Sequence, residues 1–204
     1  MVEWRGPDAM CGIAGSLGLP LEEATPAVER MRRAMAHRGP DDHGTEVLTA
    51  PGFEHPVVFT HNRLAIIDLS AAGHEPMFRA SRRLALTYNG EVYNFGELRA
   101  ELQGRGATFT SATDAEVILA GYEAWGTKSV ERMRGMFAFA VADSAEGRVW
   151  LCRDRLGIKP LYVARPKSGG LLFASEVRAL LAAGREFVPP RASRAAIESF
   201  LAQG

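Results

Sequence analysis

Cys11 is the residue in this sequence whose surroundings most favour chemistry. It follows Met10 directly and opens the small-residue, strand-like run 11–19. If Met10 is the initiator methionine and is removed, Cys11 becomes the first residue and carries a free α-amine beside its own thiol. Such an amine has a pKa of about 7.7–8.0, so it can act as general base for the thiol near neutral pH. The alternative is an ordinary buried thiol, because free cysteine is among the most buried residue types.

Two further sites carry polar residues that a strand pattern does not require. Arg63 interrupts the apolar run 56–67, where a charge would normally be unfavourable. Asn89 and Gly90 divide the strand-like run 83–94. An Asn-Gly pair is typical of a hairpin turn, but an Asn amide and a Gly N–H can also stabilise an oxyanion. Both interpretations remain open for this pair.

Other polar features have a structural interpretation beside the functional one. Asp114 lies in the first turn of a predicted helix, where a carboxylate also stabilises the helix dipole. The charged run 153–162 predicts a surface turn, or a buried pair of Arg153 and Asp154 that orders two strand ends. Residues 168–170, Ser-Gly-Gly, are interpreted as a turn and not as a pyrophosphate-binding loop, because no Asp-Ser follows.

Composition indicates one domain with a core of its own. The chain has 204 residues, 47% of them hydrophobic, with 24 basic and 24 acidic side chains. This balance favours neither a nucleic acid nor a membrane as partner, and the longest apolar runs, such as 135–142, are too short to span a bilayer. With only Cys11 and Cys152 there is no disulfide framework, which predicts a cytoplasmic location; Cys152 is expected to be a core strand thiol.

The predicted elements indicate an α+β, layered architecture. The first helix is expected to begin with Thr25 as N-cap and Pro26 at its first position, and to end at Gly39. A capping box of Thr113 and Glu116 is expected to open a later helix. Strands are predicted over 45–50, 56–67, 83–94, 135–143, 148–154, 160–165 and 171–175, and further helices over 95–106, 113–126, 176–184 and 193–204.

Eight collinear strings resemble a known family. They read MCGIAG, MAHRGPDDHG, HNRLAIIDLSAAGHEPM, YNGEVYNFGELRAEL, TDAEVILAGYEAWG, GMFAFAVAD, RDRLGIKPLYVA and LFASEVRALL, and they extend from residue 10 to about residue 183. Together they resemble the glutaminase domain of class II, N-terminal-nucleophile glutamine amidotransferases. The combination of RGPDD, NGEVYN and LGIKPLY is most similar to the branch of glutamine-hydrolysing asparagine synthetases.

The resemblance implies a catalytic role for three residues. Cys11 would be the nucleophile that forms a thioester with glutamine, with its own α-amine as base. Asn89 and Gly90 would form the oxyanion hole. The family fold implied is a four-layer αββα sandwich, with two antiparallel sheets between helices.

The resemblance also implies how glutamine is held, with no metal ion. Arg63 would bind the substrate α-carboxylate, which suits a bidentate guanidinium–carboxylate pair. The remaining implied residues are the backbone of the adjoining segment, Leu64, Ile66 and Ile67, and two acids for the α-ammonium group, Glu91 and Asp114.

The domain organisation follows from the same resemblance. Residues 1–10 are expected to be a leader or a mis-assigned start before Met10, because a leader would leave the Cys11 nitrogen as a peptide amide. Residues 11–185 would form the glutaminase domain, and 186–204 a linker and the start of a synthetase domain that these residues do not contain. ATP and magnesium are expected only in that missing domain, with no cofactor in this chain.

Two alternatives to asparagine synthesis stay open. The ammonia could serve another acceptor, as in amide or antibiotic pathways, because the acceptor site lies outside these residues. The domain could also bind glutamine without turnover if the leader stays in place. In either case we expect an exposed apolar face where a synthetase domain, in the same chain or in a separate subunit, would dock. Such a face predicts self-association of the isolated chain, for instance as a homodimer.

Overall fold

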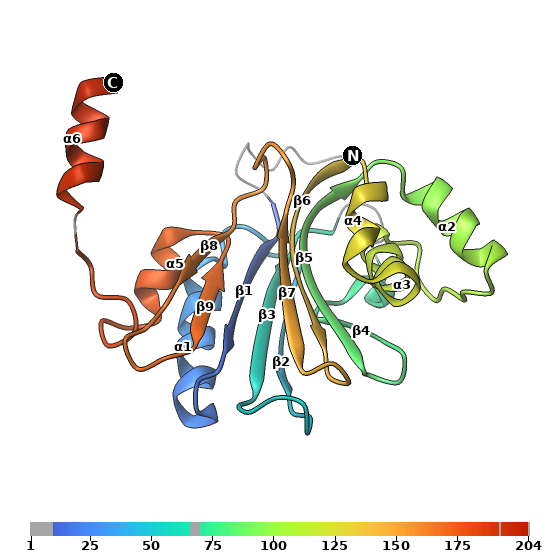
Figure 1. The fold of residues 1–204 in the computed structure, drawn as a ribbon, viewed down its shortest axis with the longest axis horizontal. Coiled ribbons are helices and arrows are strands. Elements are labelled where there is room, and N and C mark those ends of the chain that lie inside the picture. The colour runs from blue at the N-terminus through green and yellow to red at the C-terminus, as the bar shows by residue number, and fades with distance from the viewer. Residues whose placement is uncertain (1–9, 66–69, 192, 204) are drawn as a thin grey trace.

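Two antiparallel sheets lie face to face in the computed structural model, which describes residues 10–65, 70–191 and 193–203 (Figure 1). In sheet order, the first sheet contains β2 (Asp42–Leu48), β3 (Val57–Arg63), β1 (Gly12–Leu17), β9 (Leu171–Ala174) and β8 (Tyr162–Ala164). The second contains β4 (Met77–Arg79), β5 (Leu84–Val92), β6 (Gly135–Asp143) and β7 (Arg148–Arg153).

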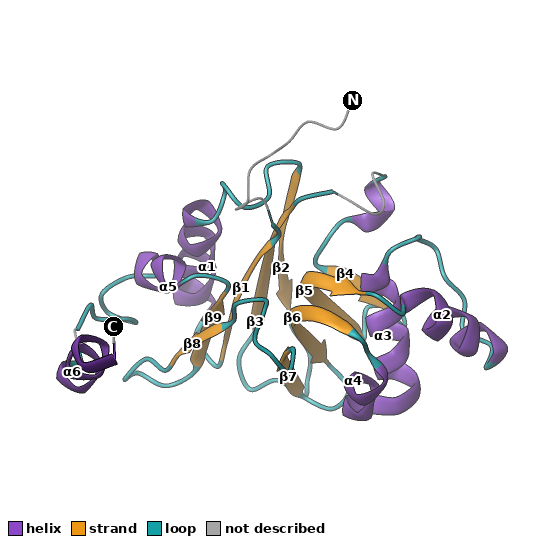
Figure 2. Ribbon diagram, turned by 90° about the horizontal axis from the view of Figure 1, so that it is seen from above, coloured by secondary structure: helices purple, strands orange, loops and turns teal. Residues whose placement is uncertain are grey.

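Helices cover the outer face of each sheet, as Figure 2 shows. On the first sheet lie α1 (Leu21–Ala34) and α5 (Val177–Ala182). On the second lie α2 (Phe95–Gly104), α3 (Asp114–Trp125) and α4 (Ser129–Arg132). The predicted α+β, four-layer αββα sandwich is therefore confirmed.

The two sheets approach each other over a core rich in alanine. Side chains alternate along β6, so that Phe137 and Phe139 pack toward the helices while Ala138 and Ala140 face the first sheet. Opposite these alanines, the ring of Phe173 packs on a second phenylalanine, Phe59, with centroids 5.6 Å apart and an angle of 82° between the planes. The small residues on one sheet thus leave room for the large rings on the other.

The first helix begins earlier than its predicted cap. α1 starts at Leu21, with Pro20 as N-cap, so Pro26 lies inside the helix and Thr25 does not cap it. The exposed Pro26 ring faces away from the core, while Ala24 and Val28 are buried against the first sheet. Burial of this apolar face, and not the Thr-Pro signal, therefore sets where the helix begins.

Thr113 is the N-cap of α3 as predicted, but the capping box is only half formed. The Thr113 hydroxyl accepts from the Glu116 N–H at 3.3 Å. The Glu116 carboxylate accepts instead from the N–H groups of Thr110 and Ser111, at 2.8 and 2.7 Å. These contacts tie the preceding loop to the helix and fix the place of Asp114 at its first turn.

The charged loop after β7 is ordered by backbone hydrogen bonds and not by a pair of Arg153 with Asp154. The Asp154 carboxylate accepts from the N–H groups of Phe137 and Lys159, at 3.2 and 3.0 Å. Arg153 donates to the Lys159 carbonyl at 2.7 Å. The buried-pair interpretation is therefore wrong, and the loop that carries Lys159 is held to β6. Residues 168–170 lie in a turn, as predicted.

The last helix, α6 (Arg194–Gln203), stands apart from the sandwich (Figure 1). Its apolar residues Ile197, Phe200 and Leu201 are 48%, 72% and 76% exposed, which agrees with the predicted unpartnered face. Over the described part of the chain, no helix has the length and apolar character that crossing a membrane requires. Cys11 and Cys152 are both free thiols, and Cys152 lies half-buried on β7.

Replacing Phe173 by Ala should destabilise the sandwich by about 3–5 kcal/mol, because it removes a fully buried ring between the sheets. Phe200→Ala is the matched control. Its ring is 72% exposed, so we expect a change within about 0.5 kcal/mol. Urea denaturation followed by circular dichroism measures both, and equal stability of the two variants would contradict the described core.

Candidate active site

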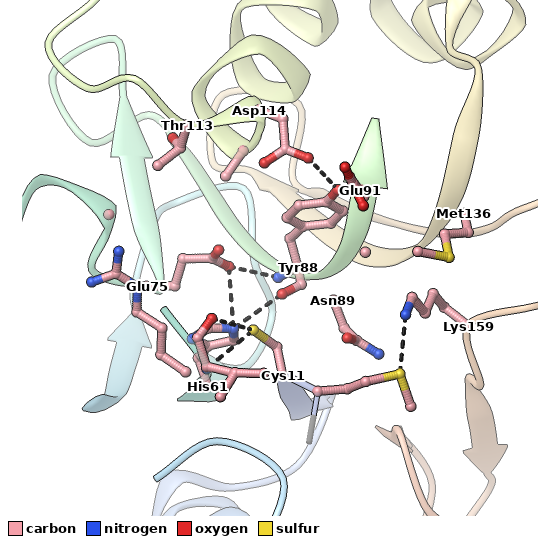
Figure 3. A pocket seen from close by; sticks show the side chains of 16 residues that line it. Cys11, His61, Glu75, Tyr88, Asn89, Glu91, Thr113, Asp114, Met136 and Lys159 are labelled. Atoms are coloured by element: carbon pink, nitrogen blue, oxygen red, sulfur yellow. Dashed lines mark hydrogen bonds and ion pairs between the residues drawn. The ribbon is translucent and has the colours of Figure 1, made fainter. Parts of the chain in front are cut away.

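A pocket opens at the end of the sandwich where β3, β5 and the start of α3 meet, and Cys11 lies at its edge (Figure 3). Cys11 immediately precedes β1, whose neighbours in the sheet are β3 and β9. The pairing of Gly12 with Asn62 brings Cys11 beside the end of β3. Of the predicted site residues, the pocket contains Cys11, Arg63, Leu64, Asn89, Gly90, Glu91 and Asp114.

Cys11 is half-buried, and its thiol is protonated in this arrangement. The Leu64 N–H donates to Sγ at 3.4 Å, and Sγ donates to the Leu64 carbonyl at 3.7 Å. Burial, with a contribution from the negative charge of Glu75, raises the pKa of the thiol to about 12. These contacts hold the sulfur in place, but they do not supply a base that could take its proton.

The main chain around Cys11 is held by hydrogen bonds to Arg38, which follows α1, and to Ser175, which precedes α5. Arg38 donates to the Cys11 carbonyl at 3.0 Å and pairs with Glu176 at 3.0 Å. The Met10 N–H donates to the Arg38 carbonyl at 3.0 Å. The Ser175 hydroxyl accepts from the Ile13 N–H at 3.0 Å. Residues on both sides of Cys11 are thus fixed by hydrogen bonds.

Asn89 and Gly90 lie inside β5 and do not form a hairpin turn. They pair with Ala138 and Phe137 of β6 in an uninterrupted antiparallel register. The hairpin interpretation is therefore wrong, since a long neighbouring strand continues the pairing past this point. A Cβ on Gly90 would lie 2.3 Å from the Met136 carbonyl oxygen, so glycine is required there by the close approach of β6.

The amide of Asn89 is a buried donor. The residue is 2% exposed, and its Nδ2 has no hydrogen-bond partner within the described residues. Figure 3 shows this amide in the pocket, between Cys11 and Lys159 in that view. A buried donor without a partner costs about 1–3 kcal/mol. Native proteins contain few such groups, which marks this one for a ligand.

Arg63 ends β3 and turns its guanidinium into the pocket. It is 8% exposed, and its Nη1 donates to the Ser70 carbonyl at 3.0 Å. A Cβ on Gly73 would lie 2.0 Å from Nη2, so glycine at position 73 leaves the space that the guanidinium fills. Ile66 and Ile67, also predicted to line the site, lie outside the described residues.

Asp114 and Glu91 lie on the opposite side of the pocket from Cys11 (Figure 3). Asp114 accepts from the Tyr88 hydroxyl at 2.6 Å and from the Val92 N–H at 2.9 Å. Burial raises the pKa of Asp114, against the opposing effect of these hydrogen bonds. Glu91 is exposed. The pocket thus carries a cationic wall near Arg63 and an acidic wall near α3.

Two buried side chains of the pocket, Glu75 and His61, were not found from the sequence. Glu75 accepts from the Tyr88 N–H at 2.7 Å, and burial raises its pKa well above the usual range. His61 donates from Nε2 to the Tyr88 carbonyl at 3.0 Å, and burial lowers its pKa to about 3. A neutral His61 whose Nε2 is already engaged is a poor base for Cys11. His61 lies within a predicted strand and Glu75 in a loop, and neither position follows a sequence pattern that indicates a functional site.

Lys159 is a third pocket residue that the sequence patterns did not indicate. It was part of the charged run 153–162, for which the sequence predicted either a surface turn or a buried pair of Arg153 and Asp154. The residue is instead 8% exposed, and its Nζ lies 3.0 Å from the sulfur of Met10. Only the folding of that loop back onto β6 reveals the location, so a linear pattern could not have found it.

Comparison with known proteins gives consistent results. A putative glutamine-hydrolysing asparagine synthetase of Mycobacterium tuberculosis is 44% identical over 184 residues, which cover 84% of this chain and 28% of that protein. Asparagine synthetase B of Escherichia coli is 37% identical over 174 residues, covering 84% of this chain and 30% of that protein. The chain thus spans less than a third of the length of these relatives.

A solved structure has the same fold at low sequence identity. It is the glutamine phosphoribosylpyrophosphate amidotransferase of Bacillus subtilis, with a TM-score of 0.72, 22% identity, and coverage of 85% of this chain and 44% of that one. The family model described as "Glutamine amidotransferase domain" matches residues 10–204. The chain therefore belongs to the glutamine amidotransferase domain family, and its relatives within it are asparagine synthetase-like proteins.

Proposed function

We propose that this domain hydrolyses the side-chain amide of glutamine through a thioester on Cys11, and releases ammonia. The observation that carries the proposal is the buried Asn89 Nδ2, a donor without a partner in the pocket that Cys11 lines. An oxyanion formed by attack of Cys11 on a carbonyl would accept from this group. Gly90, next in β5, would supply its backbone N–H as the second donor.

The base in this mechanism is the α-amine of Cys11 itself, with Cys11 as the first residue of the active chain. No histidine or carboxylate within the described residues hydrogen-bonds to Sγ, and its pKa of about 12 leaves the thiol protonated. A free amine on the same residue is always close to Sγ. It would take the thiol proton as Sγ attacks, and then give it to the leaving nitrogen.

The two halves of the reaction balance in protons and bonds. Attack forms the S–C bond, and collapse of the tetrahedral intermediate breaks the C–N bond, so ammonia leaves with the proton from the α-ammonium group. Water, with the amine again as base, then attacks the thioester. The S–C bond breaks, the thiol regains a proton, and glutamate leaves.

Charge complementarity supports glutamine as the substrate. We assign the α-carboxylate to Arg63, a buried cation that lines the pocket, with the backbone of Leu64 beside it. Glu91 and Asp114 would hold the α-ammonium group. The opposed cationic and acidic walls fit a zwitterion, and the carbonyl between them would reach Cys11 and Asn89.

The acceptor of the ammonia belongs to the longer protein. We assign residues 11–185 to the glutaminase domain and 186–204 to a linker that leads to a synthetase region. Since the relatives are named glutamine-hydrolysing asparagine synthetases, we propose ATP-dependent amidation of aspartate as the reaction that consumes the ammonia. ATP and magnesium would then bind in that region, in the same chain or in a separate subunit.

Asn89→Ala should lower kcat for glutamine hydrolysis by about 100- to 1000-fold, because it removes one oxyanion donor. The assay is release of ammonia by the chain with Cys11 as its first residue, and Cys11→Ala sets the background. Gln103→Ala, which removes an exposed amide on α2, is the matched control and should keep full activity. Wild-type activity in Cys11→Ala or Asn89→Ala would disprove the proposal.

Gly73→Ala should raise KM for glutamine roughly tenfold or more, because its Cβ displaces the guanidinium that binds the α-carboxylate. Gly96→Ala is the control, since a Cβ there meets nothing within 4 Å. Steady-state kinetics separate the two parameters. An unchanged KM in Gly73→Ala would show that Arg63 does not hold the substrate.

A further inference from the structure

Lys159 is a buried cation that has no anionic partner within the part of the chain that the structure describes. It is 8% exposed, and among the described residues its ammonium group donates to the Met10 sulfur at 3.0 Å, a weak acceptor. No carboxylate forms an ion pair with it within the described residues. Burying an ammonium group without an anionic partner costs folding free energy. Lys159 therefore does not serve to stabilise the fold, which favours a functional role in the pocket.

The loop that carries Lys159 is built to hold it there. The Asp154 carboxylate accepts from the Lys159 N–H at 3.0 Å and from the Ile158 N–H at 2.9 Å. Arg153 donates to the Lys159 carbonyl at 2.7 Å. Because the backbone is fixed on both sides, the side chain extends into the pocket from a rigid base (Figure 3).

Arg38 places a second positive charge beside Cys11. Its Nε donates to the Cys11 carbonyl at 3.0 Å, while its Nη2 is buried and has no partner in the described part of the chain. Glu176 pairs with Arg38, but the same carboxylate also contacts His37 and Arg178. One carboxylate shared among these basic groups leaves the region with positive charge.

We propose that Lys159 and Arg38 keep the α-amine of Cys11 unprotonated at neutral pH, so that it can accept the thiol proton. This inference rests on the proposed function, in which that amine is the base. A positive charge nearby disfavours protonation of an amine, and burial increases the effect because it weakens screening. Lys159 thus acts through the α-amine of Cys11, whose protonation it disfavours, and does not touch the reacting carbonyl.

The direction of the effect agrees with the behaviour of Lys159 itself. Burial and then the charge of Arg38 lower the pKa of Lys159. A negative charge on Cys11, when its thiol is ionised, and the charge of Glu91 act on it in the opposite direction. Lys159 therefore interacts electrostatically with both Arg38 and Cys11, and an ammonium group on residue 11 would be repelled by the same two cations.

Carboxylates that face the pocket oppose the effect. Burial raises the pKa of Glu75 well above its usual range, which favours the neutral form of that carboxyl group. Asp114 is tied to the Tyr88 hydroxyl and the Val92 N–H, and Glu91 is exposed to screening by water. The titratable and charged groups that surround Cys11 come from β3, β5, α3 and four loops: His61, Arg63, Tyr88, Glu91, Asp114, Arg38, Glu75, Lys159 and Glu176.

The test is the pKa of the α-amine in the chain that starts at Cys11, with Lys159→Met as the variant. Acylation of the amine by acetic anhydride across a pH series, read by mass spectrometry, gives this pKa without any need for activity. The pH dependence of kcat/KM gives it a second time. We expect both midpoints to rise by about one pH unit, so that hydrolysis well below the midpoint slows about tenfold and recovers at high pH.

Two further variants serve as controls. Lys159→Arg keeps the charge and should keep the wild-type midpoint. Lys167→Met removes a lysine from an exposed turn and should leave the midpoint unchanged. Lys159→Gln is measured in the same way if the methionine variant does not fold.

An unchanged α-amine pKa in Lys159→Met would overturn the inference. So would an equal loss of kcat/KM at every pH with no shift of the midpoint, because Lys159 would then act on the substrate itself. If the wild-type chain with Cys11 first releases no ammonia, the proposed function fails. The acylation series would still decide what Lys159 does to the amine.

Discussion

The pairing of β1 between β3 and β9 is the constraint on which the site depends. It places Gly12 opposite Asn62 and so brings the residue before it, Cys11, to the end of β3, where Leu64 contacts the sulfur. The second sheet then supplies Asn89 from the middle of β5. Packing between the two sheets across small alanine side chains sets how far apart these two groups lie. The chemistry of the pocket therefore follows from how closely the two sheets pack.

Burial has opposite consequences for the groups around the thiol. It raises the pKa of Cys11 and Glu75 and lowers that of His61 and Lys159, so each group is driven toward its neutral form. If Cys11 is the nucleophile, as we propose, it needs a base that does not depend on a neighbouring side chain. An amine on the same residue would meet that need, and the positive charges nearby would favour its neutral form. The same low polarity that makes the thiol unreactive thus favours the base that would activate it.

Much of the fold could be predicted from sequence, and most of what could not depends on contacts between distant segments. The strand-length apolar run at 135–143 predicted β6, and the helix after Thr113 was predicted with its N-cap. The start of α1 was missed because burial on the sheet overrides a local Thr-Pro signal. Resemblance to a family indicated that Asn89 is part of a site, whereas local turn propensity alone favoured a hairpin. Glu75 and Lys159 reach the pocket only through loop folding, which leaves no periodic pattern in the sequence.

The most direct test of the central claim compares two forms of the same chain, one with Cys11 as its first residue and one with residues 1–10 still attached. Intact mass establishes the N-terminus of each, and release of ammonia from glutamine is then measured at equal concentration. We predict turnover by the first form and none above background by the second, because only the first has an amine beside the thiol. Equal rates from both forms would contradict the claim, since a peptide nitrogen cannot serve as the base.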